Sequence, residues 1–180
     1  EVITGEEGLN YLKSKGMSGN ATKVAVTGGK AQGPEGLDQR YYNPAKIEQK
    51  LKDLHAKYPN LTSVVEIGKS LQGRSIWALV VSTTPNLNDP KFYDKPSVLF
   101  DAMHHAREVM TPDIAMDIGE SLLSAASKSP GRARETVSSM NIVIIPMLNV
   151  DGNAIVWSSD NMWRKNAHKE GNSTFGVDIN

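Results

Sequence analysis

The apolar residues of the chain follow two different spacings, which predict helices that alternate with strands. A short helix is expected near the N-terminus, from Thr4 to Gly16. A longer helix is expected over residues 44–58, with Asn43 as its N-cap and Pro44 in its first turn. A third helix is expected to begin at Thr111. Its buried face is predicted from apolar side chains that recur every three to four residues, namely Ile114, Ile118, Leu122 and Ala125.

Short apolar runs predict the strands. Residues 62–67 and 75–82 are joined by a turn that is too short for a crossover, so they are expected to form an antiparallel pair. Residues 97–100 form a third apolar run. Residues 141–148 contain consecutive β-branched side chains, which are typical of a strand buried on both faces, and Pro146 is expected to end that strand or to bulge it.

Strands that alternate with long helices predict an α/β fold, a three-layer sandwich in which a mixed, mainly parallel sheet lies between helices. Residues 176–180 alternate like a strand that has just begun, so we expect the sheet to be incomplete in this chain. Ligands of open α/β sheets bind beyond the carboxyl ends of the strands. The segments that follow residues 100 and 148 are therefore the candidate sites.

Composition narrows the possible partners. The 180 residues include 20 Lys and Arg against 20 Asp and Glu, so no overall field attracts nucleic acid or an anionic membrane surface. No apolar run approaches the roughly 20 residues of a membrane span. Because the chain contains no cysteine, disulfides and thiolate metal sites are excluded, and a metal ion would need His, Asp or Glu as ligands.

The densest chemistry follows the third apolar run, where His105, Arg107 and Glu108 lie within four positions. A histidine and a carboxylate three residues apart can turn onto one Zn²⁺, and a catalytic zinc takes three protein ligands and one water. The alternative is a solvated strand end at which the two side chains merely pair. Further along the chain, Trp163 could hold Arg164 as a fixed donor for a carboxylate or an oxyanion, unless Arg164 is an ordinary surface arginine.

Taken together, these pieces resemble the zinc metallocarboxypeptidases related to carboxypeptidase A, and in particular the bacterial carboxypeptidase T-like branch. The order and spacing of the shared residues match from about Tyr41 onward. The matching residues are Gly68, Ser70, Gly73, Arg74, His105, Ala106, Arg107, Glu108, Pro112, Asn149, Asp151, Gly152, Trp163, Arg164, Lys165, Gly176, Val177, Asp178 and Asn180.

The resemblance implies a hydrolase that removes C-terminal residues from peptides and proteins by means of one zinc ion. It implies that His105 and Glu108 are zinc ligands and that Asp178 is the carboxylate that holds the ligand histidine. Arg164 resembles the catalytic residue that stabilises the oxyanion of the scissile carbonyl. Arg107 resembles an arginine that contacts the peptide, and Asn180 resembles part of the clamp on its terminal carboxylate.

The family's third zinc ligand, a second histidine, and its glutamate base lie beyond the position matched by Asn180. We therefore expect residues 40–180 to form the N-terminal half of a catalytic domain, inactive alone and completed by a C-terminal half. His168 is a local but unfavoured candidate for the third ligand. Residues 1–39 fall outside the resemblance and are expected to be an extension or the remains of a propeptide. A secreted or periplasmic location is implied by the family.

Two other functions are compatible with the same residues. The first is a zinc amidohydrolase of the same fold, such as a deacylase or a cell-wall amidase. The second is a non-catalytic binding module that retains the fold. The presence of His105, Arg107, Glu108 and Arg164 together favours an enzyme over a binding module.

Overall fold

A computed structural model describes residues 37–128, 130–170 and 174–179, which belong to a compact unit that spans Ala31–Asn180. Most of the predicted extension, residues 1–36, lies outside the described residues together with the short helix expected there, and so does Asn180. The elements are α2 (Pro44–Lys57), β1 (Thr62–Lys69), β2 (Ser75–Val81), a 3-10 turn (Pro90–Phe92), β3 (Ser97–Asp101), α3 (Thr111–Lys128), α4 (Arg132–Ser139), β4 (Asn141–Ile145), α5 (Val150–Ser158), β5 (Lys169–Glu170) and β6 (Thr174–Phe175).

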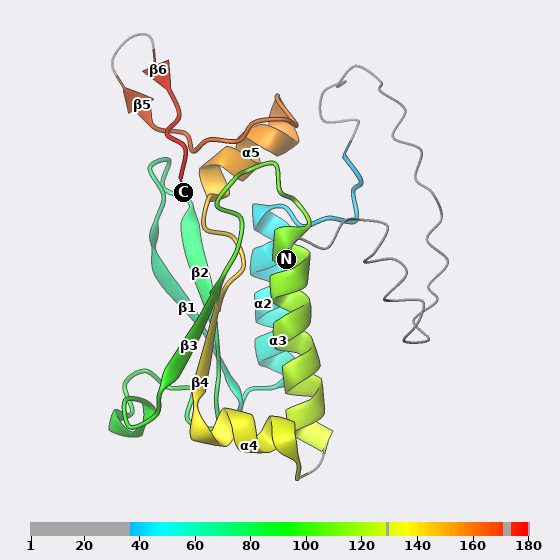
Figure 1. The fold of residues 1–180 in the computed structure, drawn as a ribbon, viewed down its shortest axis with the longest axis vertical. Coiled ribbons are helices and arrows are strands. Elements are labelled where there is room, and N and C mark those ends of the chain that lie inside the picture. Colours follow the sequence, from blue (N-terminus) through cyan, green and yellow to red (C-terminus); the bar gives the residue numbers. More distant parts are fainter. Residues whose placement is uncertain (1–36, 129, 171–173, 180) are drawn as a thin grey trace, which may run out of the picture. The chain divides into compact units, whose positions relative to one another are not determined.

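Strands β1 to β4 form one mixed sheet with the order β1-β2-β4-β3 (Figure 1). The short turn between β1 and β2 gives the expected antiparallel pair. Strands β2 and β4 are also antiparallel, whereas β3 and β4 are parallel. Only β3 and β4 are connected through helices here, and a parallel pair requires such a crossover. The mixed α/β fold is thus confirmed, although within the described residues antiparallel pairs outnumber parallel ones.

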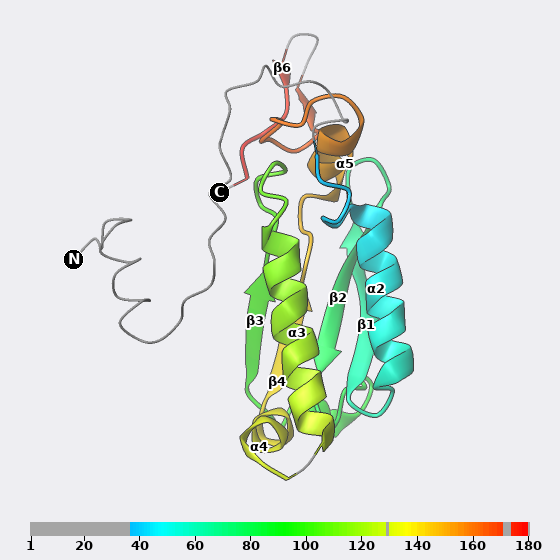
Figure 2. The same ribbon diagram turned by 90° about the vertical axis from the view of Figure 1, so that its right-hand side faces the viewer.

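The two long helices, α2 and α3, cover the same face of the sheet (Figures 1 and 2). Asn43 opens α2 as predicted, because its side chain accepts a hydrogen bond of 2.9 Å from the Lys46 N–H. Leu51 of α2 and Leu123 of α3 are fully buried against the sheet residue Leu79. Of the three expected layers, the described residues therefore form two, a sheet and one helical layer.

The buried face of α3 differs from the predicted one. Of the predicted residues, Ile118 and Leu122 are partly buried and pack against the core, whereas Ile114 is 53% exposed. The fully buried positions are Pro112, Ala115, Met116, Gly119, Leu123 and Ala126. The fully buried positions lie one residue further along the helix than most of the predicted ones. A Cβ atom added at Gly119 would stand only 2.9 Å from the Ile144 Cδ1 atom. The absence of a side chain at Gly119 therefore lets this face of α3 lie close to β4.

The C-terminal segment also differs from the prediction. Residues 176–179 form no strand, and the preceding residues form the small hairpin of β5 and β6. Gly176 has φ +84°, a left-handed conformation that suits glycine and turns the chain away from the hairpin. None of the helices in the described ranges is long and apolar enough to span a membrane.

Candidate functional site

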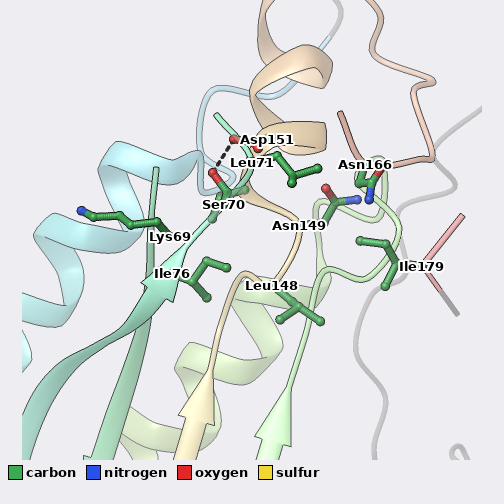
Figure 3. Close-up of a pocket in the computed structure, with 10 residues that line it drawn as sticks. Lys69, Ser70, Leu71, Ile76, Leu148, Asn149, Asp151, Asn166 and Ile179 are labelled. Carbon is green, nitrogen blue, oxygen red and sulfur yellow. Dashed lines mark hydrogen bonds between the residues drawn. The ribbon is translucent and has the colours of Figure 1, made fainter. Parts of the chain in front are cut away.

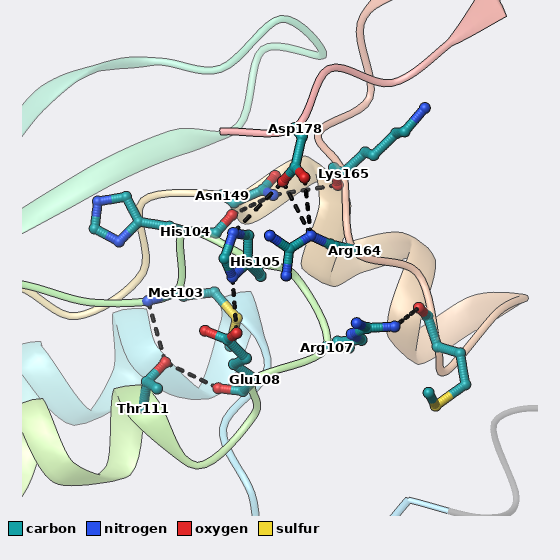
Figure 4. Close-up of polar contacts among 11 residues, drawn as sticks. Met103, His104, His105, Arg107, Glu108, Thr111, Asn149, Arg164, Lys165 and Asp178 are labelled. Atoms are coloured by element: carbon teal, nitrogen blue, oxygen red, sulfur yellow. Dashed lines mark hydrogen bonds and ion pairs between the residues drawn. The ribbon is translucent and has the colours of Figure 1, made fainter. Parts of the chain in front are cut away.

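His105 and Glu108 lie in the loop between β3 and α3, just beyond the carboxyl end of β3. The loop turns so that the two side chains meet, with 2.7 Å between His105 Nδ1 and Glu108 Oε1 (Figure 4). The His105 side chain is mostly buried, whereas the Glu108 side chain is about half exposed. The predicted pair is therefore brought together at the surface of the molecule, with the histidine held more firmly than the carboxylate.

The other ring nitrogen of His105 faces the C-terminal segment. Asp178 Oδ1 lies 3.5 Å from His105 Nε2, a separation too long for a hydrogen bond. Nε2 is nevertheless buried and has no hydrogen-bond partner among the described residues. A buried ring nitrogen of this kind requires a partner, and the carboxylate of Asp178 lies beside it. A small movement of residues 176–179 would close the contact.

Asp178 is already engaged by Arg164. The Arg164 Nε–H donates to both carboxylate oxygens, at 2.9 and 3.1 Å. This hydrogen bond, together with the charge of the guanidinium and those of His105 and Lys165, holds the pKa of Asp178 below its usual range. The carboxylate is therefore ionised at neutral pH and stands between the histidine and the arginine. The bonds use only Nε, so both Nη groups of Arg164 remain without a hydrogen bond to any described residue.

Arg107 lies at the edge of this cluster. Its Nη1 atom is 3.5 Å from the Met162 carbonyl oxygen, a weak contact, and the side chain is exposed. Figure 4 shows its guanidinium directed away from the pair of His105 and Glu108. The structure thus brings together four of the predicted site residues, places Arg107 beside them, and does not describe Asn180.

Asn149 joins the two segments that carry these residues. It caps α5 through a 3.0 Å hydrogen bond from the Gly152 N–H to its Oδ1 atom. Its Nδ2 atom donates to the carbonyls of His104, at 2.8 Å, and Lys165, at 3.2 Å. Sequence reasoning gave Asn149 no role, although an asparagine at the start of a helix beyond a buried strand was the available signal.

The junction between these two segments, at the start of α5, also requires glycine at position 152. A Cβ atom added to Gly152 would lie 2.6 Å from Asn149 Oδ1 and 2.8 Å from Ala106 Cβ, and closer still to the Lys165 carbonyl oxygen. The Ala106 N–H donates to the Arg164 carbonyl at 2.9 Å. The backbone beside His105 is therefore bonded directly to the backbone of Arg164. This contact explains how residues 59 positions apart in sequence share one site.

Asp151 connects the junction to the turn between β1 and β2. Its buried carboxylate accepts hydrogen bonds from Ser70 Oγ and Arg74 Nη1, each at 2.7 Å, and from the Gln72 N–H at 2.9 Å. Figure 3 shows this side chain beside an apolar cavity of about 340 Å³ that Asn149 also lines. The cavity contains neither His105 nor Glu108, so the candidate chemistry lies in the loop after β3 and outside this cavity.

The geometry of His105 and Glu108 fits a zinc ion as two ligands. A nitrogen and a carboxylate oxygen are both ordinary zinc donors, and here they point at one location. Among the described residues, no group of three His, Asp or Glu side chains could hold a metal. His168 does not join the pair; its backbone carbonyl accepts from the Gly176 N–H beside the hairpin. The described residues thus offer this pair and no third side chain to complete it, and the assignment of His105 and Glu108 as zinc ligands stays a prediction.

The chain is similar in sequence to known proteins. Residues 47–180 match the family model described as zinc carboxypeptidase. A zinc carboxypeptidase of Saccharothrix mutabilis subsp. capreolus is 34% identical over 143 residues, which are 78% of this chain and 31% of that protein. An inactive metallocarboxypeptidase of Schizosaccharomyces pombe is 30% identical over 142 residues, 77% of this chain and 28% of that protein.

Solved structures agree with the sequence comparison. The crystal structure of the carboxypeptidase A from Helicoverpa armigera superimposes with a TM-score of 0.66 and 28% identity, over 100% of this chain and 41% of that one. Bovine thrombin-activatable fibrinolysis inhibitor, in complex with tick carboxypeptidase inhibitor, gives a TM-score of 0.64 and 27% identity, over 78% of this chain and 42% of that one. The chain thus spans less than half the length of these relatives. It belongs to the zinc carboxypeptidase family.

Proposed function

We propose that this chain is the N-terminal part of the catalytic domain of a zinc-dependent carboxypeptidase, which hydrolyses the C-terminal peptide bond of peptides and proteins. One observation carries the proposal: His105 and Glu108 converge within 2.7 Å, and the Arg164–Asp178 pair faces the other nitrogen of the same histidine. If His105 and Glu108 merely paired with each other at a solvated strand end, the charged side chains of Arg164 and Asp178 would not be needed beside them.

The roles follow from the contacts. His105 and Glu108 would hold the zinc ion as two of its ligands. When bound, zinc lowers the pKa of a water molecule and polarises a carbonyl group. Asp178 orients the imidazole of His105 through its Nε2 side, which leaves Nδ1 as the ligand atom.

The free Nη groups of Arg164 stabilise negative charge that develops on the scissile carbonyl oxygen. Such donors contribute most when they are fixed in advance, and the two hydrogen bonds to Asp178 fix this guanidinium. Arg107 contacts the peptide from the edge of the site, and Asn180 binds its terminal carboxylate.

The third zinc ligand and the general base are proposed to come from a complementary C-terminal half of the domain. Edge strand β3 supports this proposal, because it exposes Val98, Leu99 and Phe100 in the described structure. An apolar edge strand is a natural place for a sheet to continue. By the same family likeness, we propose a secreted or periplasmic location, which cell fractionation would test.

The proposal is tested with the complete protein that contains this chain. Zinc content and hydrolysis of a blocked dipeptide are measured for the wild type and for Arg164→Lys, which keeps the charge and loses the planar fork. We expect kcat to fall by about 10²-fold or more while KM changes little and zinc stays bound. A pure KM effect would contradict the role of Arg164, and full hydrolysis by the 180 residues alone would contradict the shared site.

A second candidate, a non-catalytic binding module, is favoured by one specific finding. Two relatives, from Schizosaccharomyces pombe and Sclerotinia sclerotiorum, are named inactive metallocarboxypeptidases. This alternative predicts that the complete protein binds peptide C-termini without hydrolysing them. The zinc amidohydrolase alternative predicts instead that acylated amino acids or cell-wall peptides are cleaved faster than blocked dipeptides. One panel of substrates therefore separates all three functions.

A further inference from the structure

The hydroxyl group of Thr111, the first residue of α3, makes two hydrogen bonds that none of the proposed roles explains. The hydroxyl accepts from the Met103 N–H at 3.1 Å and donates to the Glu108 carbonyl at 2.8 Å (Figure 4). The Thr111 N–H also donates to the Glu108 carbonyl, at 2.9 Å. One side chain thus links the backbone of Glu108 to the backbone two residues before His105.

Met103 is held in an unfavourable conformation. Its φ is +60°, and among the described residues it is the only one other than glycine with a positive φ. A non-glycine residue keeps such a conformation only where its surroundings fix it. The carbonyl of Met103 accepts from the Asn149 N–H at 3.0 Å, its sulfur lies 3.9 Å from Asn153 Nδ2, and the side chain is almost fully buried.

The conformation of Met103 sets the direction in which the chain enters His105. If residue 103 relaxed to an ordinary φ, the peptide planes that follow would rotate and carry the imidazole away from Glu108. The Met103 N–H is the one backbone group of this residue that is bonded to the loop of Glu108, and it is bonded through the Thr111 hydroxyl.

We propose that Thr111 is a positioning residue for the metal pair, because its hydroxyl sets the backbone of His105 relative to that of Glu108. The inference rests on the proposed function, since it concerns the zinc ligands. Thr111 touches neither ligand side chain in the hydrogen bonds above, so it acts through the two backbones.

Ordinary helix capping does not account for these contacts. A capping side chain accepts from a backbone N–H two or three residues further along the helix. The Thr111 hydroxyl accepts instead from Met103, eight residues earlier in the chain. A capping role would affect the stability of α3, whereas the role proposed here affects the distance between two zinc donors.

The test compares two kinds of substitution in the complete protein. Thr111→Val keeps the branched shape and removes the hydroxyl, and Thr111→Ala removes it without added bulk. Thr111→Ser keeps the hydroxyl. Thr136→Val is a matched control, because the Thr136 hydroxyl only donates to the Arg132 carbonyl within α4, at 2.9 Å. The zinc dissociation constant is measured by competition with a chelator, and urea unfolding is measured for the metal-free proteins.

We expect Thr111→Val and Thr111→Ala to weaken zinc binding by about 10- to 100-fold, as the loss of groups that orient metal ligands usually does. Thr111→Ser and Thr136→Val are expected to stay within about threefold of the wild type. Zinc binding by Thr111→Ala at wild-type affinity, or equal weakening in Thr111→Ser, would overturn the inference. Absence of peptide hydrolysis by a zinc-loaded wild type would overturn only the proposed function, because the affinity comparison needs no substrate.

Discussion

Replacement of Gly152 by alanine tests whether the contact between the two site segments is as close as described. The new methyl group would press on Asn149 Oδ1 at 2.6 Å and on Ala106 Cβ at 2.8 Å, as well as on the Lys165 carbonyl. Cβ atoms do not approach other atoms so closely, and two of these three neighbours, Lys165 and Ala106, are a backbone group and a Cβ that move only with the chain. The loop between β3 and α3, which carries Ala106, must therefore move away from α5, and so must the segment that carries Arg164 and Lys165.

The expected loss in the free energy of unfolding can be worked out from the hydrogen bonds near Gly152. Separation would lengthen the bond from Ala106 N–H to the Arg164 carbonyl and the bond from Asn149 Nδ2 to the Lys165 carbonyl. Loss of a buried hydrogen bond costs about 1–3 kcal/mol when a partner is left unsatisfied. Alanine stabilises a helix by about 1 kcal/mol relative to glycine, which offsets part of this cost. A net loss of about 2–4 kcal/mol is expected.

The assay is urea unfolding of the complete, metal-free protein, with kcat and zinc affinity measured beside it. Gly68→Ala is the control, because a Cβ added there meets nothing within 4 Å, and it should change stability by less than about 1 kcal/mol. Gly152→Ala should also lower kcat, since Arg164 moves relative to His105. Equal stabilities for the two variants would refute the close contact, and unchanged kcat in a destabilised variant would refute its link to the site.

Two further predictions concern stability alone. Asp151→Ala should destabilise the metal-free protein by about 1–3 kcal/mol in urea unfolding, because the Gln72 N–H and the Ser70 hydroxyl lose a buried acceptor; a change below about 0.5 kcal/mol would contradict this. Leu123→Ala should cost about 2–5 kcal/mol, while Leu122→Ala, at a half-buried position, should cost about half as much or less. A larger loss of stability for Leu122→Ala than for Leu123→Ala would instead support the buried face of α3 that was predicted from the sequence.

The sequence predicted the general fold because its signals are local. Asn43 and Pro44 mark the start of α2, and the β-branched run before Pro146 marks β4, which ends at Ile145 as expected. The buried face of α3 was predicted only in part: Ile118 and Leu122 pack against the core, but Ile114 is exposed and the fully buried positions are others. The close approach of Gly119 to Ile144 is one contact of this face that is not visible in a sequence.

The site was predicted in part for a similar reason. His105 and Glu108 lie three positions apart, so a turn of the loop is enough to bring them together. Asp178 could be connected to them only through the family resemblance, because no local spacing relates residues 73 positions apart. The bonds of Thr111 were not predicted, since they depend on the left-handed conformation of Met103. Methionine carries no preference that would reveal it.

The exposed edge of β3 has a practical consequence. Val98, Leu99 and Phe100 are 38%, 55% and 38% exposed, and no strand of the described ranges pairs with β3 on its outer side. An apolar edge of this kind pairs readily with strands of other molecules and promotes aggregation. A recombinant protein limited to these 180 residues should therefore precipitate or form oligomers during purification. Coexpression with the proposed complementary half, or the substitution Leu99→Lys, should keep it in solution.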